Sequence, residues 1–108
     1  SPRVLNAPDH LEQIPALVGA MSWMDPEAYS HQVDAILEHD TFSRLHQVRA
    51  PTLVMAAAED VLTPVMLSQE IAAAIPGARL TVLPRGNHAV QIEDPETFNA
   101  AVLAFLAE

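Results

Sequence analysis

Apolar and polar positions follow two different patterns along this 108-residue chain. Up to about Val48 the apolar side chains recur at helical spacing, whereas beyond it short continuous apolar runs alternate with helical stretches. We therefore predict a helical segment over residues 1–47 and a strand–helix–strand–helix segment over residues 48–108. Strands that alternate with helices are typical of an α/β fold with parallel strands.

The first segment holds one uncertain and one clear helical pattern. Pro15 suits the first turn of a helix over residues 15–22. A second helix is predicted to begin with Asp25 as N-cap and Pro26 as its first residue. Its apolar stripe would consist of Tyr29, Val33, Ile36 and Leu37. Asp40 is predicted to cap a short helix that ends at Leu45.

The second segment opens with a strand over residues 52–57, which is apolar without alternation, as in a strand covered on both faces. Thr63 and Pro64 then predict a helix start. The buried stripe of that helix would consist of Leu67, Ile71, Ala74 and Ile75. The Pro-Gly pair at residues 76–77 ends it, and residues 78–83 predict a second, parallel strand.

A last helix is predicted with Asp94 as cap and Pro95 as its first residue. Its buried face would consist of Phe98, Val102, Phe105 and Leu106. Two parallel strands are too few for a stable sheet, and a strand covered on both faces needs a neighbour on each side. We therefore expect further strands, supplied by another polypeptide or by self-pairing of this chain.

Composition narrows the range of partners. The net charge is −9, with five Lys and Arg residues in total, so a nucleic acid partner is not expected. The absence of cysteine excludes thiolate chemistry and fits a reducing compartment. No apolar run reaches the roughly 18 residues of a membrane span and no signal peptide is visible, so we expect a cytoplasmic location. The first residue, Ser1, fits either removal of an initiator Met or a piece of a longer chain.

Two residues carry candidate acid–base chemistry. Asp60 follows the first predicted strand and His88 follows the second, so both should lie at the carboxyl edge of the sheet, where ligands bind in open α/β folds. A carboxylate bonded to one ring nitrogen would leave the other free to take a proton. The alternatives are that Asp60 is a turn residue and that His88 is solvated. Because Thr63 is predicted to cap the following helix, Asp60 is not required for that role.

Several spaced motifs then coincide. The strand reads PTLV at residues 51–54, followed by AAED at 57–60 and a proline four residues after Asp60. IPGA follows at residues 75–78, and His88 is followed by Glu93, Pro95 and Phe98. This part of the chain, from residue 46 to 106, closely resembles the C-terminal third of α/β-hydrolase enzymes. The stretch AILEHDTFSRLHQVRAPTLV resembles the join between lid and strand in oxoadipate-type enol-lactonases and aminoacrylate-type hydrolases.

The resemblance implies a fold and a set of roles. Residues 1–47 would form a helical lid, and residues 48–108 would form the C-terminal part of the catalytic domain. Asp60 would be the acid and His88 the base of a catalytic triad. Trp23 and Met24 either line a substrate pocket under the lid or are packing residues. Leu62 and Ala89 would touch the substrate because they lie beside the triad members.

The chain also departs from the family. The glycine that precedes the acid by three positions is Ala57 here, and no serine stands in the Gly-x-Ser-x-Gly turn that carries the nucleophile. We therefore expect a companion N-terminal hydrolase segment that supplies the serine and the oxyanion-hole donors. No metal or organic cofactor is expected, because His31 and His39 lie too far apart on one helix for a good metal-binding pair. Glu93 could replace Asp60 as the acid, but loop support is the more economical role.

These inferences lead to one preferred function and two alternatives. The preferred function is hydrolysis of a small carboxylic ester, an enol-lactone or a related carbonyl compound, by a chain that is inactive alone. The first alternative is a non-catalytic module or ligand-binding protein of the same fold, on its own or as a homo-oligomer. The second is a C–C hydrolase, a haloperoxidase-like enzyme or an acyltransferase that uses the same residues.

Overall fold

The computed structural model describes residues 15, 19 and 25–108. It divides into two units, one over Pro2–Asp40 and the other over Thr41–Glu108, which we describe separately. Most of the predicted helix over residues 15–22 lies outside the described residues, as do Trp23 and Met24. Within the described part of the chain, no helix is long and apolar enough to cross a membrane.

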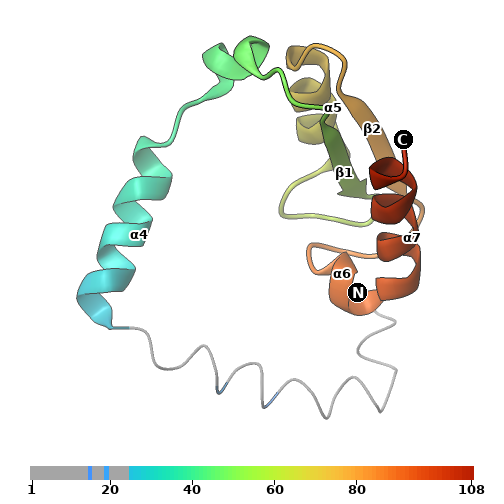
Figure 1. The fold of residues 1–108 in the computed structure, drawn as a ribbon. Coiled ribbons are helices and arrows are strands. Elements are labelled where there is room, and N and C mark those ends of the chain that lie inside the picture. The colour runs from blue at the N-terminus through green and yellow to red at the C-terminus, as the bar shows by residue number, and fades with distance from the viewer. Residues whose placement is uncertain (1–14, 16–18, 20–24) are drawn as a thin grey trace. The chain divides into compact units, whose positions relative to one another are not determined.

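In the first unit, helix α4 spans Pro26–Glu38 (Figure 1). Its predicted start is confirmed, because the Asp25 side chain accepts hydrogen bonds from the backbone N–H groups of Glu27 and Ala28. The predicted apolar stripe is present but open to solvent, since Tyr29, Ile36 and Leu37 are each at least 59% exposed. This face of α4 is therefore available for packing.

The second unit opens with a 3₁₀ helix, η1, over Phe42–Gln47. The prediction that Asp40 caps this helix is wrong. Thr41 takes the N-cap position, and its side chain makes no capping hydrogen bond. A 3₁₀ helix is short and tight, and such turns are frequent as connectors between longer elements.

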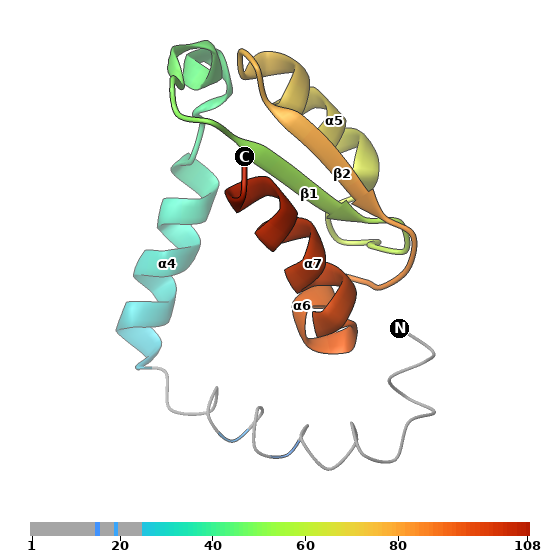
Figure 2. The same ribbon diagram turned by 45° about the vertical axis from the view of Figure 1, so that its right-hand side comes forward.

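The sheet consists of β1, Leu53–Ala57, and β2, Arg79–Leu83, which pair in parallel from Leu53 opposite Arg79 to Ala57 opposite Leu83. Helix α5, Val65–Ala74, connects them. Figure 2 shows α5 on one face of the two strands, with α7 on the other. The predicted parallel strand–helix–strand unit is therefore confirmed.

The start of α5 differs from the prediction. Pro64 takes the N-cap position and no side chain caps the helix, so the prediction that Thr63 is the cap is wrong. The hydroxyl group of Thr63 instead donates to Asp60. The predicted buried stripe is only partly covered: Leu67 is 43% exposed, whereas Ile75 at the C-terminal end is buried.

Two helices follow β2. Helix α6 spans Val90–Glu93 and was not predicted, because four residues are too few to show a helical period. Helix α7 spans Pro95–Leu106, and its predicted cap is confirmed, since Asp94 accepts from the N–H of Thr97. Phe98, Val102 and Phe105 are half-buried as expected, but Leu106 is exposed.

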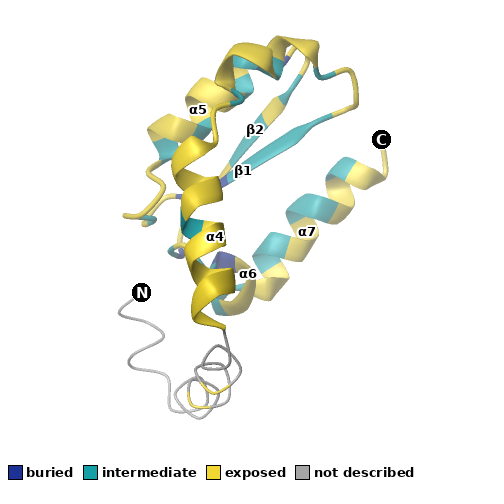
Figure 3. Cartoon of the chain, turned by 90° about the vertical axis from the view of Figure 1, so that its left-hand side faces the viewer, coloured by how far each residue is buried: buried dark blue, intermediate teal, exposed yellow. Residues whose placement is uncertain are grey.

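The core of the second unit is small. It consists of Ala57, Leu83 and Val90, with Met55, Phe98 and Ala101 packed against it. Figure 3 shows that most of the two strands is only partly buried. Among the described residues the sheet has two strands, so one edge of each has no partner strand. Parallel strands are normally covered on both faces and flanked on both sides, so the expectation of further strands remains a prediction that this geometry favours.

Candidate active site

The carboxyl ends of the two strands place Asp60 and His88 together. Ala57 and Leu83 are the last residues of β1 and β2 and lie opposite one another. The chain then reaches Asp60 in three residues on one side and His88 in five on the other. Because both loops leave the same edge of a parallel sheet, their side chains can meet, as the sequence predicted.

The two loops are joined by hydrogen bonds beyond the last paired strand residues. The N–H of Ala58 donates to the carbonyl oxygen of Leu83 at 2.9 Å, and the N–H of Glu59 donates to that of Gly86 at 3.1 Å. Gly86 has a φ of +97°, in the left-handed region that side chains with a Cβ rarely occupy. The glycine therefore lets the His88 loop turn back and bond to the Asp60 loop.

The Asp60 carboxylate is held mainly by its own loop. Its Oδ1 atom accepts from the backbone N–H groups of Leu62, at 2.9 Å, and Thr63, at 3.1 Å. Its Oδ2 atom accepts from the Thr63 hydroxyl group at 2.7 Å. The Thr63 hydroxyl has the largest influence on the pKa of Asp60, and it lowers that pKa. The two N–H groups and His88 lower it further, whereas partial burial raises it, and the result is a pKa well below the usual range. Asp60 is therefore an anion throughout the neutral range.

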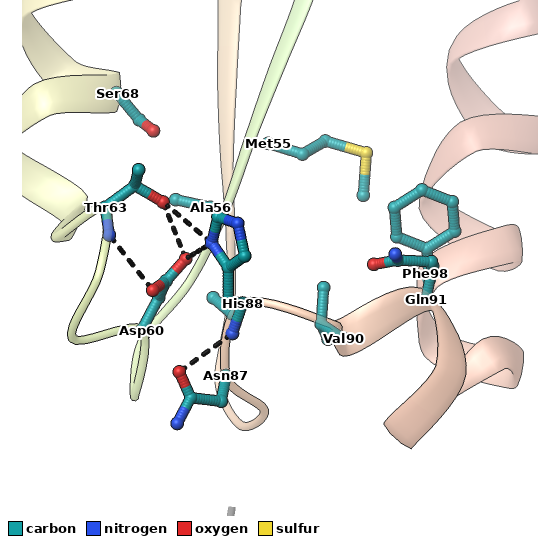
Figure 4. A pocket seen from close by; sticks show the side chains of 11 residues that line it. Met55, Ala56, Asp60, Thr63, Ser68, Asn87, His88, Val90, Gln91 and Phe98 are labelled. Carbon is teal, nitrogen blue, oxygen red and sulfur yellow. Dashed lines mark hydrogen bonds and ion pairs between the residues drawn. The ribbon is translucent and has the colours of Figure 1, made fainter. Parts of the chain in front are cut away.

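His88 contacts the same carboxylate through one ring nitrogen. Its Nδ1 atom lies 3.1 Å from Asp60 Oδ2, and the ring is 56% exposed while the Asp60 side chain is 8% exposed. An ionised carboxylate can only accept, so Nδ1 must carry the hydrogen of this bond. In the neutral ring the Nε2 atom is then an unprotonated acceptor, which Figure 4 shows on the side of the ring away from Asp60.

The backbone around His88 is fixed by its neighbours. The Asn87 side chain accepts from the N–H of His88 at 2.8 Å, and Glu93 Oε2 accepts from the N–H of Asn87 at 3.0 Å. Glu93 therefore binds the loop from α6, which is the supporting role predicted for it as the alternative to the triad acid.

A cavity of about 190 Å³ opens beside the pair. Its wall combines apolar side chains with a few polar groups, as small-molecule sites do. Besides Asp60 and His88, its lining includes Met55, Thr63, Ser68, Val90, Gln91 and Phe98. Figure 4 shows the His88 ring between Asp60 and Thr63 on one side and the Met55, Val90 and Phe98 side chains on the other.

The structure brings together some of the predicted site residues and not others. Asp60 and His88 are in contact and line the cavity. Leu62 and Ala89 do not line it; Leu62 is 70% exposed, and its contribution to the site is the backbone N–H that binds Asp60. Trp23 and Met24 lie outside the described residues. The substrate-contact roles of these four residues remain predictions.

Thr63 is a further residue of the site that the sequence pattern did not predict. Its oxygen lies 2.7 Å from Asp60 Oδ2 and 3.3 Å from His88 Nδ1. A signal was available, because a threonine three residues after an aspartate can return its N–H and hydroxyl groups to that carboxylate. The same threonine also precedes a proline, and that pattern predicts a helix start instead.

No group that could hold a metal is formed by the residues the structure describes: nowhere among them do three or more His, Cys, Asp or Glu side chains gather. The residues of the candidate site are an acid, a base and a hydroxyl group. Such an arrangement can orient an imidazole and move a proton at its Nε2 atom.

Comparison with known proteins gives a family. A model described as "Alpha/beta hydrolase family" matches residues 2–101. A protein named "Putative carbamate hydrolase RutD" from Caulobacter sp. (strain K31) is 40% identical over 82 residues, which are 76% of this chain and 31% of that protein. The protein of the same name from Escherichia coli (strain K12 / DH10B) is 37% identical over 76 residues, which are 70% of this chain and 29% of that protein. The chain thus spans about a third of the length of these relatives.

Solved structures agree. The enol-lactonase from Burkholderia xenovorans LB400 superposes with a TM-score of 0.77 and 27% identity, over 94% of this chain and 40% of that chain. The "Putative non-heme bromoperoxidase BpoC" from Mycobacterium tuberculosis H37Rv superposes with a TM-score of 0.81 and 29% identity, over 99% of this chain and 40% of that chain.

Proposed function

This chain belongs to the alpha/beta hydrolase family, and from that premise we propose that it supplies the acid, Asp60, and the base, His88, of a serine-type hydrolytic site. The substrate class is a small carboxylic ester, an enol-lactone or a related carbonyl compound. The serine and the oxyanion-hole donors come from a companion segment. The reaction takes place in the cytoplasm, a location that the lack of cysteine supports.

The observation that carries this proposal is the contact between His88 Nδ1 and Asp60 Oδ2 at 3.1 Å. It supports an imidazole whose Nε2 atom is free to accept a proton, beside a cavity of about 190 Å³. The carboxylate next to it is an anion, so it stabilises the imidazolium that forms when Nε2 is protonated.

The proposed reaction has two halves. In the first, the companion's serine oxygen bonds to the substrate carbonyl carbon while its proton passes to His88 Nε2. That proton then goes to the leaving-group oxygen as the bond between carbonyl carbon and leaving group breaks. In the second, water gives a proton to Nε2 and its oxygen bonds to the acyl carbon. The proton returns to the serine oxygen as the acyl–serine bond breaks, and the carboxylic acid is released.

A companion segment is supported by the state of the sheet. Five apolar residues are buried among those described, namely Ala56, Ala57, Ile75, Leu83 and Val90. Strand β1 has the continuous apolar sequence of an interior strand, yet its edge away from β2 is unpaired in the described residues. A parallel neighbour at that edge would satisfy its backbone groups and cover its side chains.

Residues 1–47 are proposed to form the lid of this enzyme. The support is the apolar face of α4, where Ile36 is 73% and Leu37 is 79% exposed. Replacing both by Ser should raise KM for an apolar ester by a larger factor than it lowers kcat, since a lid contributes to binding and water exclusion. A fall in kcat with KM unchanged would contradict a lid role.

The first experiment determines whether a nucleophile accompanies the chain. Protein purified by a tag on this chain is analysed by intact mass and treated with a serine-directed fluorophosphonate. We expect a labelled second polypeptide beside the 11.7 kDa chain. A single folded species that is never labelled and hydrolyses nothing would support the non-catalytic module instead.

The second experiment tests the base. His88→Ala in the assembled enzyme should lower turnover by at least about a thousandfold, because the proton acceptor is lost. His46→Ala is the matched control, since His46 lies exposed on η1 and accepts from the Arg49 guanidinium group through its backbone carbonyl. Near-normal turnover of the His88 variant would end the assignment.

The relatives suggest the substrates to compare. An aryl ester, an enol-lactone and a carbamate each present a carbonyl carbon to the same nucleophile, and the similar proteins are named for the latter two. The ratios of the kcat/KM values for these three compounds would identify the substrate class. The three compounds are attacked at the same kind of carbonyl carbon but differ in their leaving groups, so the ratios measure the preference of the site.

A second function is haloperoxidase-like oxidation at the same pair. It is favoured by the similarity to a protein named as a bromoperoxidase, which extends over 99% of this chain. The assay supplies acetate, hydrogen peroxide and bromide with a halogen-accepting dye; peroxide in place of water would release the acyl group as a peracid, which oxidises bromide. Bromination that exceeds ester hydrolysis by the same preparation, and that is lost in His88→Ala, would favour this alternative.

A further inference from the structure

Thr63 is bonded to both members of the proposed pair. Its hydroxyl group donates to Asp60 Oδ2 at 2.7 Å, and its oxygen lies 3.3 Å from His88 Nδ1. The His88 Nδ1–H therefore points at two acceptors, the Asp60 carboxylate and the Thr63 oxygen. Figure 4 shows the three side chains as a closed set of contacts at one end of the cavity.

The direction of each bond follows from chemistry. An ionised carboxylate has no hydrogen, so the threonine hydroxyl must be the donor to Asp60. Once that hydrogen is committed to Asp60, the threonine oxygen can only accept from His88. Both acceptors then require the hydrogen on Nδ1, and neither tolerates a bare Nδ1 lone pair.

The backbone gives the same loop a second hold on the carboxylate. The N–H of Thr63 donates to Asp60 Oδ1 at 3.1 Å, so one residue binds both oxygens of the acid. The rotation of the carboxylate is thereby fixed by its own loop. The bond to His88 then forms to an acceptor that is already oriented.

We propose that Thr63 is a positioning residue, which fixes the rotation of the Asp60 carboxylate and selects the Nδ1–H tautomer of the His88 ring. Its role in catalysis rests on the proposed function, because the selected tautomer is the one with Nε2 free to accept a proton. The arrangement itself rests on the contacts alone. The lowered pKa of Asp60, to which the Thr63 hydroxyl is the largest contributor, is consistent with this role.

The test compares Thr63→Val, which removes the hydroxyl and keeps the shape, with Thr63→Ser, which keeps the hydroxyl. Thr63→Ala is a second variant that lacks the hydroxyl group. Because Thr63 lies exposed in a loop before α5, these variants should fold. Thr52→Val is the matched control, because it removes a threonine hydroxyl that bonds to Ala50 at the start of β1. Circular dichroism checks that each variant is folded.

The readout is magnetic resonance of the isotope-labelled chain, purified together with any companion segment that it binds, and no substrate is needed. In Thr63→Val the proton affinity of Asp60 should rise about tenfold or more, since a hydrogen bond to a charged group is lost. The ring ¹⁵N shifts of His88 should move toward a larger share of the Nε2–H tautomer, because the Nδ1 hydrogen loses one of its two acceptors while Asp60 remains. Thr63→Ser should restore both signals, and Thr52→Val should alter neither.

The outcomes separate this inference from the proposed function. A folded Thr63→Val or Thr63→Ala variant with an unchanged Asp60 titration and an unchanged His88 tautomer would overturn the inference, as would a serine variant that restores neither. In the assembled enzyme kcat should fall about tenfold in Thr63→Val with KM little changed, and an unaltered kcat would also contradict the role. Failure of the proposed function would be seen in a different result: wild-type protein that is never labelled and never hydrolyses an ester.

Discussion

Replacing Gly86 by Ala should damage both stability and the site. The residue has a φ of +97°, and a Cβ there would lie 2.5 Å from Val90 Cγ2 and 3.0 Å from Val90 Cβ. Val90 is buried in the core and begins α6. The new methyl group therefore meets a side chain that cannot move away into solvent.

Two separate costs follow from these numbers. Holding a residue with a Cβ in the left-handed region costs about 1–2 kcal/mol. Forcing a methyl group into packed surroundings costs about 1–3 kcal/mol more. Gly77→Ala is the matched control, because Gly77 has a φ of +74° and no atom within 4 Å of the added Cβ. Its expected cost is the backbone part alone, about 1–2 kcal/mol.

Urea unfolding followed by circular dichroism measures the difference between the two variants. We expect Gly86→Ala to lose about 1–3 kcal/mol more than Gly77→Ala, the overpacking part. Val90→Ala removes the Cγ2 atom that causes the shorter contact, so the penalty of Gly86→Ala should be smaller when Val90 is already Ala. Equal losses at the two glycines, with additive effects of the substitutions at 86 and 90, would refute the reasoning.

Four further predictions concern charged groups. The Asp60 carboxyl should stay ionised at pH 3 in ¹³C titrations, because its pKa in the folded protein is lowered. The contribution of this group to stability is therefore complete above about pH 4 and is lost as the pH falls below that value. An ordinary titration near pH 4 would contradict the contacts. Asp94→Ala should cost about 1 kcal/mol in urea unfolding through loss of the α7 cap, and Asp25→Ala should lower the helix content of α4. Glu93→Gln should cost about 1 kcal/mol by weakening the bond to the N–H of Asn87, and an unchanged unfolding midpoint would exclude this support.

The strands and the meeting of Asp60 with His88 could be predicted from the sequence. The continuous apolar run at residues 52–57 and the run at 78–83 predicted two strands, and the helix between them required those strands to be parallel. Parallel strands end at one edge, so residues a few positions beyond each end must approach. The topology brings the two loops to one edge, and the Nδ1–H of the histidine then makes the contact at 3.1 Å.

Two of the four helix caps were not predicted correctly, and the site role of Thr63 was indicated only by its spacing from Asp60. Asp40 and Thr63 have good capping side chains, but Thr41 and Pro64 take the cap positions. The path of the preceding loop decides which of two adjacent residues has the required backbone angles, and local preference cannot determine that path. The hydroxyl of Thr63 is bonded to Asp60 instead, and this choice depends on a loop conformation that the periodic pattern does not encode.

The bonds that join the two loops have a consequence for engineering. Because Ala58 is tied to Leu83 and Glu59 to Gly86, the acid and the base are held in register by one short network rather than by two independent turns. A designer who transplants the histidine loop into another scaffold without its aspartate counterpart would lose the partner that sets its path. The two loops should be moved together, and lengthening either one alone should separate a pair that the scaffold otherwise keeps aligned.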